Sequence, residues 1–263
     1  MSTTLIELRD IDFGYPDHPV LEGVNFSLQP GERVALTGDN GAGKTTLLQL
    51  MIGLHQPARG EIIAFGRCRS GEADFREVRA QAGLLFQDSD DQLFCPTVLE
   101  DVSFGPLNLG RSVDEATRIA DRTLSQLGLE GLRERITHKL SGGEKRMVAL
   151  AGVLAMEPQV LLMDEPTNGL DSTAEQRLLD HLESLPLAMF FVSHDRRVVE
   201  RLANRAVMLQ ERRLQDALMH SHPHIHSHAH LHIHAAGVET GHSHSDTNPG
   251  HTHHHEDHHS TDL

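Results

Sequence analysis

Aromatic residues are scarce in this chain of 263 residues: tryptophan is absent, tyrosine occurs once and aromatics make up 4% of the composition. Hydrophobic residues still reach 38%, so any core must be built mostly from aliphatic side chains. No apolar run approaches the roughly 20 residues that a membrane-spanning helix needs. The N-terminal MSTTLIELRD also lacks the basic flank and apolar stretch of a signal peptide. Any role at a membrane is therefore expected to be peripheral.

Cysteine and positive charge are scarce as well. The two cysteines, Cys68 and Cys95, do not form a Cys-x-x-Cys pair, and isolated thiols of this kind predict no disulfide. The net charge is −15 with histidine neutral, which argues against nucleic acid as a partner, because surfaces that bind it carry a basic stripe. Of the 21 histidines, 16 follow Met219. Protonation or metal binding there would offset much of the acidity.

Short β-rich runs alternate with helical ones as far as residue 215, which predicts an α/β fold on a mainly parallel sheet. An antiparallel β subdomain is expected at the N-terminus and a helical subdomain at about residues 88–158, both within a domain of residues 1–218. Residues 219–263 are rich in histidine and poor in large apolar side chains, so they predict a flexible, disordered tail. The expected elements are strands at Leu5–Phe13, Val24–Leu28, Arg33–Gly38, Val160–Asp164 and Ala188–Ser193, and helices at Lys44–Leu54 and Ser112–Leu127.

A glycine-rich segment between the strand at 33–38 and the helix at 44–54 matches the phosphate-binding pattern GxxxxGK[ST]. Glycines allow successive backbone N–H groups to turn toward phosphate oxygens, and the start of the helix adds a favourable field. We expect the lysine to reach the outer phosphates and the threonine hydroxyl to bind Mg²⁺. The segment is Gly38-Asp39-Asn40-Gly41-Ala42-Gly43-Lys44-Thr45.

Two adjacent acids end a later aliphatic strand, VLLMDE at residues 160–165. We expect Asp164 to hold the metal ion, directly or through water, and Glu165 to orient or deprotonate the attacking water. Together with the phosphate-binding segment, the pair predicts hydrolysis of a nucleoside triphosphate. Kinases, GTPases and helicases share these features, so they do not define the family.

A third segment, Leu140-Ser141-Gly142-Gly143-Glu144, opens a helix whose Met147, Leu150, Ala151 and Leu154 share one apolar face. A serine and two glycines at a helix start form a second anion site, although one phosphate does not need two such sites. Here the chain resembles the ABC ATPase family, whose signature is LSGGQ; the glutamine is replaced by Glu144. The resemblance implies that Ser141, Gly142 and Gly143 face the γ-phosphate held by another subunit.

The resemblance extends over about 180 residues and assigns further roles. It implies that Tyr15 stacks on adenine and that Thr46 belongs to the ATP-binding set. Gln87 matches the glutamine that senses Mg²⁺ and γ-phosphate, and His194 matches the histidine that contacts γ-phosphate. Asn168-Gly169-Leu170-Asp171 matches the loop that crosses the dimer interface. A complete set in one chain predicts a homodimer with two competent sites, although heterodimerisation stays open.

The segment QDSDDQLFCPTVLEDVSFGP, residues 87–106, is similar to the ATPases of energy-coupling-factor importers, which take up vitamins and transition metals. In that family the region receives helices of a transmembrane coupling subunit, which works with a substrate-binding membrane subunit. Asp90, Asp91, Glu100 and Asp101 would suit basic residues on such a partner. The predicted location is the cytoplasmic face of the cell membrane.

Histidines alternate with other residues at the start of the tail. Imidazole is a good ligand for Ni²⁺, Co²⁺ and Zn²⁺, and the resemblance to importers of nickel and cobalt favours one of those two metals as cargo. Imidazole alone does not select among them. The candidate ligands are His220, His222, His224, His226, His228, His230, His232 and His234.

Other interpretations stay open from the sequence. The chain could power import of a vitamin, with the tail acting as a metal buffer or sensor. It could also be an ABC ATPase that takes no part in transport. The absence of a coiled-coil insertion between the phosphate-binding segment and the signature counts against the chromosome-maintenance and DNA-repair relatives.

Overall fold

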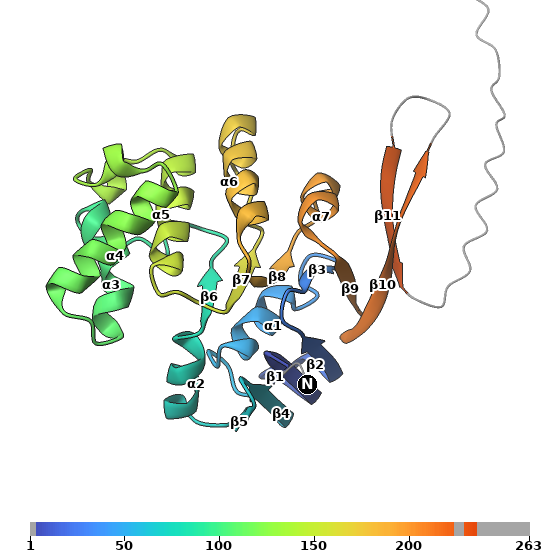
Figure 1. Ribbon diagram of the computed structural model, residues 1–263. Coiled ribbons are helices and arrows are strands. Elements are labelled where there is room, and N and C mark those ends of the chain that lie inside the picture. The colour runs from blue at the N-terminus through green and yellow to red at the C-terminus, as the bar shows by residue number, and fades with distance from the viewer. Residues whose placement is uncertain (1–3, 224–228, 236–263) are drawn as a thin grey trace, which may run out of the picture.

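The computed structural model describes residues 4–223 and 229–235, with side chains as far as Met219. Two sheets and a group of helices make up the fold (Figure 1). A four-stranded antiparallel sheet has the order β2-β1-β4-β5, and a seven-stranded sheet has the order β11-β10-β9-β3-β8-β7-β6. The strands are β1 Ile6–Tyr15, β2 His18–Leu28, β3 Arg33–Thr37, β4 Arg59–Ala64, β5 Arg67–Arg69, β6 Ala82–Leu85, β7 Val160–Asp164, β8 Ala188–Val192, β9 Arg205–Gln210, β10 Arg213–Pro223 and β11 Ala229–Ala235.

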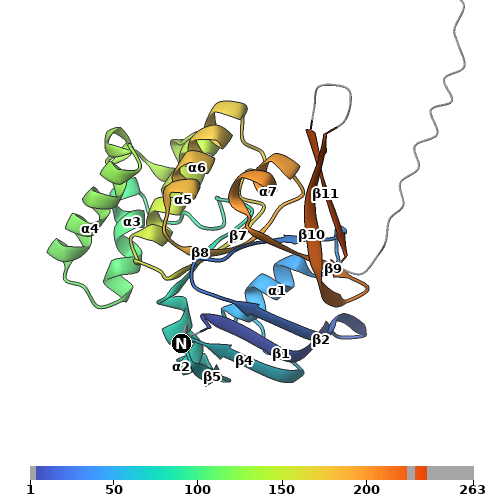
Figure 2. The ribbon, with the colours of Figure 1, turned by 45° about the vertical axis from the view of Figure 1, so that its right-hand side comes forward.

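The helices are distributed between the two faces of the larger sheet and a separate group. In Figure 2, α1 lies between the two sheets, whereas α6 and α7 lie on the other side of the larger sheet. Helices α3, α4 and α5 pack together at one end. The helices are α1 Lys44–Met51, α2 Glu72–Arg79, α3 Val98–Asn108, α4 Val113–Gln126, α5 Gly142–Leu154, α6 Ser172–Ser184 and α7 Arg196–Leu202, with short 3₁₀ turns at Glu130–Leu132 and Thr137–Lys139.

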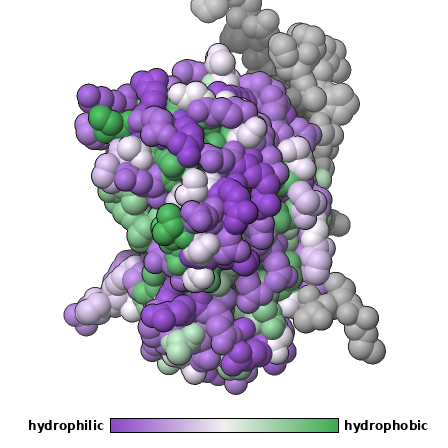
Figure 3. Space-filling model, turned by 60° about the vertical axis from the view of Figure 1, so that its left-hand side comes forward, coloured by the Kyte–Doolittle hydropathy of each residue, from purple (hydrophilic) through white to green (hydrophobic). Residues whose placement is uncertain are grey.

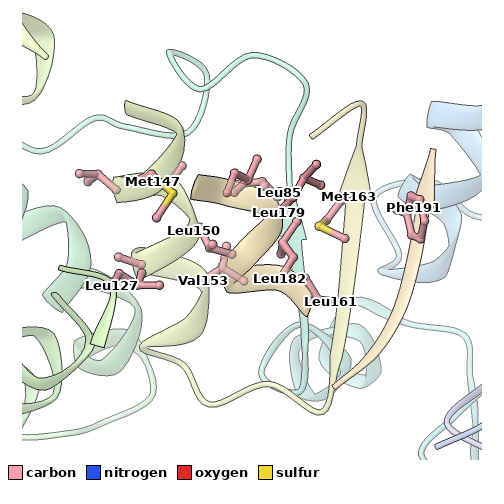
Figure 4. Close-up of a cluster of buried hydrophobic side chains, with 14 of the residues drawn as sticks. Leu85, Leu127, Met147, Leu150, Val153, Leu161, Met163, Leu179, Leu182 and Phe191 are labelled. Atoms are coloured by element: carbon pink, nitrogen blue, oxygen red, sulfur yellow. The ribbon is translucent and has the colours of Figure 1, made fainter. Parts of the chain in front are cut away.

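The central strands are buried on both faces, because their alternate residues enter two different cores. In β7, Leu161 and Met163 join the core with α5 and α6, whereas Val160 and Leu162 join the core with α1 and the smaller sheet. Figure 4 shows the first core between the strands and helices α5 and α6. Each fully buried Leu or Phe contributes about 1.5–3 kcal/mol to folding. The near-continuous apolar runs of parallel strands follow from this burial on both sides.

The predicted α/β fold, with its mainly parallel sheet, antiparallel β subdomain and helical group, is confirmed. Strands β6, β7, β8, β3 and β9 are parallel. Local chemistry sets several helix starts: Thr97, Ser112 and Ser141 each cap a helix, and a glutamate three residues later completes a capping box in all three. Both cysteines are free, as predicted. Within the described ranges, no helix is long and apolar enough to cross a membrane.

The start of the histidine-rich tail differs from the predicted disorder. The backbone of residues 219–223 continues β10, and β11 pairs with it in antiparallel fashion. The sequence has the period-two alternation of a strand there, and backbone pairing in a hairpin requires no core of its own. The domain boundary at residue 218 stays a prediction. The rest of the predicted tail, residues 224–228 and 236–263, lies outside the described residues.

Candidate functional site

The phosphate-binding segment forms a tight turn between β3 and α1, and two of its glycines are required by the backbone. Gly38 and Gly43 have φ of +143° and +105°, which side chains other than hydrogen rarely tolerate. A Cβ at residue 38 would lie 2.3 Å from the Leu209 carbonyl oxygen, and one at residue 43 would lie 2.5 Å from Val20 Cγ1. The turn therefore keeps its shape only with glycine at both positions.

Helix α1 begins at this turn with no side-chain cap, unlike α3, α4 and α5. The amide N–H groups of its first turn are therefore free of side-chain acceptors and can bind an anion. The Lys44 ammonium lies within the turn, where Nζ donates to the carbonyl oxygens of Gly38 and Asp39 at 2.8 Å each. This arrangement concentrates positive potential at the start of α1.

A pocket of about 540 Å³ opens at this turn, and we call it the P-loop pocket. Most of the site residues predicted for one subunit come together in it, from five different parts of the chain. Of the glycine-rich segment, Gly38, Asp39 and Ala42 do not line it. The residues that line it are Tyr15, His18, Val20, Asn40, Gly41, Gly43, Lys44, Thr45, Thr46, Gln87, Asp164, Glu165, Asn168, Val192 and His194.

The two predicted acids differ in environment although they are adjacent. Asp164 is buried at the end of β7, and its Oδ2 accepts the Thr45 hydroxyl at 2.5 Å. Glu165 has a left-handed backbone, with φ of +45°, a conformation that costs a non-glycine residue free energy. Its Oε1 lies 2.9 Å from His194 Nδ1. The turn of the backbone thus directs Asp164 toward α1 and Glu165 toward His194.

Oxygen donors suited to Mg²⁺ gather beside Thr45. The Thr45 hydroxyl and the Asp164 carboxylate are already in contact, and the Gln87 amide lines the same pocket. Hard divalent cations prefer such oxygen ligands, and Mg²⁺ typically takes one or two carboxylates together with substrate phosphates. The residues present therefore fit a magnesium ion bound with a nucleotide.

Tyr15 stands at the edge of the P-loop pocket and is 44% exposed. Its hydroxyl oxygen is 3.4 Å from His55 Nε2 and 3.5 Å from the Thr46 hydroxyl oxygen. The ring also packs edge-on against Phe13, with 5.3 Å between centroids. His55 and Phe13 therefore hold the one tyrosine of the chain next to α1. No sequence signal pointed to His55, because a lone histidine belongs to no motif.

The signature residues lie apart from the P-loop pocket of the same chain. Ser141 and Gly143 do not line it. Gly142 lines an adjoining pocket of about 650 Å³, which we call the α5 pocket, together with Thr45, Lys145 and Asp164. The Ser141 hydroxyl accepts the Glu144 N–H, and the Glu144 carboxylate accepts the Ser141 N–H. That N–H lowers the pKa of Glu144.

The structure gives no side-chain positions for the predicted metal ligands of the tail. His224, His226 and His228 lie outside the described residues, and His220, His222, His230, His232 and His234 are placed only as backbone positions in β10 and β11. Among side chains as far as Met219, no group of three or more His, Cys, Asp or Glu forms a metal cluster.

Comparison with known proteins decides the family. The family model described as ABC transporter matches residues 21–168, more than half of the chain. The chain belongs to the ABC transporter ATP-binding family. It is therefore an ATPase and binds ATP.

Individual ABC relatives agree with this assignment. A Brucella suis protein named as an ABC transporter ATP-binding protein is 54% identical over 219 residues, covering 83% of this chain and 91% of the relative. The energy-coupling factor transporter ATP-binding protein EcfA of Methanothermobacter thermautotrophicus is 44% identical over 210 residues, covering 78% and 68%. CbiO1 from Clostridium perfringens, described as part of the ABC transporter complex CbiONQ, superposes with a TM-score of 0.73. It is 34% identical, over 80% of this chain and 86% of that one.

A second solved ABC structure is that of a dimer. A dimeric ATP-binding cassette in a post-hydrolysis state, bound to ADP and phosphate, has a TM-score of 0.72 at 25% identity, over 81% of this chain and 98% of that one. That solved relative is a dimer, and the other relatives are named as parts of an energy-coupling factor transporter or of the ABC transporter complex CbiONQ.

Proposed function

We propose that two copies of this chain bind Mg-ATP between them and that each copy completes the other's hydrolytic site. The observation that carries the proposal is the separation of the two anion-binding helix starts: α1 opens into the P-loop pocket, whereas Ser141 and Gly143 at the start of α5 do not line it. The dimeric ABC relative with ADP and phosphate supports a second subunit as the source of the missing donors.

Within this site the chain's own groups would divide the work. Lys44 and the amides of α1 bind the phosphates, and Glu165 accepts a proton from the attacking water or aligns it. His194, in contact with Glu165 through Nδ1, holds that carboxylate and reaches γ-phosphate with the rest of its ring. Magnesium, held by Thr45, Asp164 and Gln87, would neutralise charge on the phosphate oxygens. Tyr15 would stack on adenine.

We also propose that a transmembrane coupling subunit docks on an apolar groove of about 280 Å³ between β6, α3 and α5. Phe94 and Phe104 line this groove with rings 4.6 Å apart, and they are 63% and 42% exposed. Large aromatic side chains left exposed side by side are typical of an interaction site. Figure 3 shows apolar patches among polar surface on the face that brings the helical group forward.

Three of the four acids that the sequence suggested for binding a basic partner are engaged within the chain itself. Asp101 is buried, and its carboxylate accepts the Cys95 N–H at 3.0 Å. Burial raises the pKa of Asp101 to about 6. Its bond to the Cys95 N–H holds the loop that carries Phe94, so the carboxylate is not free to meet a basic partner. Glu100 completes the cap of α3, and Asp90 pairs with Lys145 at 2.5 Å. Asp91 remains the acid best suited to a basic residue of the partner.

Replacing Phe94 and Phe104 together with alanine is expected to reduce co-purification with the membrane subunits at least tenfold. Both rings are exposed, so their loss removes partner contact and little of the core. Loss of aromatic anchors commonly costs 2 kcal/mol or more, about 30-fold in affinity. ATP binding, measured with a fluorescent nucleotide, should not change.

Val113→Ala is the matched control, because Val113 is 69% exposed and does not line the groove. Co-purification should be normal with that variant. Full assembly by the Phe94→Ala, Phe104→Ala protein would show that the coupling subunit docks elsewhere.

For the cargo we propose nickel or cobalt ions, delivered or sensed by the histidine-rich region. The register of β10 and β11 places His220 opposite His232 and His222 opposite His230. Directly opposed residues in an antiparallel pair share a face of the sheet, about 4.5–5.5 Å apart at Cβ. Four histidine positions thus fall on one face, and imidazole suits both metals. Relatives named EcfA support an energy-coupling-factor importer.

Removing residues 220–263 is expected to leave ATP hydrolysis within about twofold and to abolish most binding of Ni²⁺ and Co²⁺ measured by calorimetry. The pairing of β10 with β9 ends at Ala217, so the cut spares the contacts that join β10 to the sheet. Replacing His220, His222, His230 and His232 with asparagine in the full chain should remove the metal sites of the hairpin alone. A truncated protein that keeps every metal site would refute the role of this region and favour a vitamin importer.

A further inference from the structure

Arg146 in the first turns of α5 is a buried cation without a carboxylate partner. The residue is 2% exposed, and no ion pair within 4 Å joins it to any acid as far as Met219. Its Nε is buried and makes no hydrogen bond. Burial lowers the pKa of the guanidinium, and the more distant Asp88 and Asp164 partly oppose this. An unpaired buried charge is costly, so packing alone is a poor reason for arginine at this position.

The guanidinium binds the backbone that carries Gln87. One nitrogen donates to the Phe86 carbonyl oxygen at 2.5 Å, and the other donates to the carbonyl oxygen of Gln87 itself. These carbonyls directly follow β6 (Ala82–Leu85), and we call residues 86–91 the Gln87 turn. Because the guanidinium is planar and its two terminal nitrogens donate in parallel, it fixes both the position and the orientation of the two adjacent carbonyls.

Lys145 attaches the same helix to the far end of the Gln87 turn. Its Nζ lies 2.5 Å from Asp90 Oδ1, and the lysine side chain is only 18% exposed. Two successive residues of α5 therefore hold two ends of one turn. Because Ser141, the N-cap of α5, is only five residues before Arg146, a shift of Gln87 must move the start of α5 or break these bonds.

We infer that Arg146 is a positioning residue that couples the two ATP sites of the dimer. The inference rests on the proposed composite site, in which Gln87 serves the nucleotide of its own subunit and Ser141 to Gly143 serve the nucleotide of the partner. ATP bound at one P-loop pocket draws in Gln87, and Arg146 passes that displacement to the signature of the same chain. The partner's site is thereby completed, so binding at one site favours binding at the other.

The test is the ATP dependence of hydrolysis in the full-length protein, since a two-site dimer with strong coupling has a Hill coefficient approaching 2. We expect a coefficient well above 1 for the native chain and about 1 for Arg146→Lys, which keeps a positive charge but lacks the fork that holds both carbonyls. The half-saturating ATP concentration should rise several-fold. Arg146→Met, which removes the buried charge altogether, should behave in the same way even where the fold is more stable.

Arg177→Met is the matched control. Arg177 also binds two adjacent backbone carbonyls, those of Leu127 and Gly128 at 3.0 and 2.7 Å, but it makes no hydrogen bond to the Gln87 turn or to the signature. The Hill coefficient of the Arg177→Met protein should equal that of the native chain. A native coefficient retained by both Arg146 variants, or a coefficient of 1 in the native chain, would overturn the coupling role.

The oligomeric state of Glu165→Gln protein tests the composite site separately from the coupling. Glu165→Gln protein that stays monomeric in ATP would remove the proposed dimer and the coupling with it. ATP-driven dimers of Glu165→Gln, together with non-cooperative native hydrolysis, would leave the composite site intact and exclude Arg146 as its link.

Discussion

Replacing Glu165 with glutamine is expected to reduce ATP turnover by about 10³-fold, within the range that a general base contributes. The amide has nearly the same shape as the carboxylate, so it can keep the contact with His194 Nδ1 at 2.9 Å. It cannot accept a proton from water. Asp164 and Thr45, which fit the metal ion, are unaffected by the change. The nucleotide that remains bound should therefore be ATP and not ADP.

Single-turnover hydrolysis of labelled ATP measures this loss without interference from product release. Glu175→Gln is a suitable control, because its side chain is 18% exposed and that of Glu165 is 15%, yet Glu175 lines neither the P-loop pocket nor the α5 pocket. Turnover by the Glu175 variant should stay close to native. Rapid turnover by Glu165→Gln would remove Glu165 from its assigned role.

Gly142→Asp is expected to lower hydrolysis by about 10²-fold or more while leaving ATP binding to the isolated chain unchanged. In the proposed dimer, the start of α5 faces the γ-phosphate of the partner's nucleotide. Aspartate would replace a donor surface with negative charge, and removing a single donor to a developing negative charge already costs 10²–10³ in rate. A Cβ at residue 142 meets nothing within 4 Å, and aspartate is favourable in the first turn of a helix. The monomer should therefore fold normally.

Gly131→Asp provides a matched substitution in the helical group. A Cβ at residue 131 also meets nothing within 4 Å, and the residue lies in the 3₁₀ turn at Glu130–Leu132, away from the signature. Steady-state hydrolysis and nucleotide titration on both variants separate the two effects. Equal activity of Gly142→Asp and Gly131→Asp would show that the start of α5 does not meet the phosphates.

The P-loop pocket could be predicted from the sequence because its residues follow strands. Asp164 ends β7 and Glu165 follows it, whereas Gln87 follows β6 and His194 follows β8. The carboxyl ends of parallel strands meet at one edge of a sheet, so local patterns carry the three-dimensional arrangement. The roles of these residues remain predictions, since proximity does not measure catalysis.

Features that depend on long-range contact had no such pattern. The bonds from Arg146 to the Gln87 turn join residues about 60 positions apart, and an arginine after a helix start is usually solvated. Asp101 resembles a surface acid in the sequence, but its burial depends on how α3 packs. In the tail, low apolar content predicted disorder, whereas the alternation of histidines was compatible with the strand pairing of β10 and β11.

The central claim is that ATP joins two copies of the chain through the signature of each. Light scattering on Glu165→Gln protein, with and without saturating Mg-ATP, tests it most directly. We predict that ATP doubles the mass and that adding Gly142→Asp to the same protein abolishes the doubling while nucleotide binding persists. A protein that stays monomeric with ATP bound, or a dimer that Gly142→Asp does not weaken, would contradict the account.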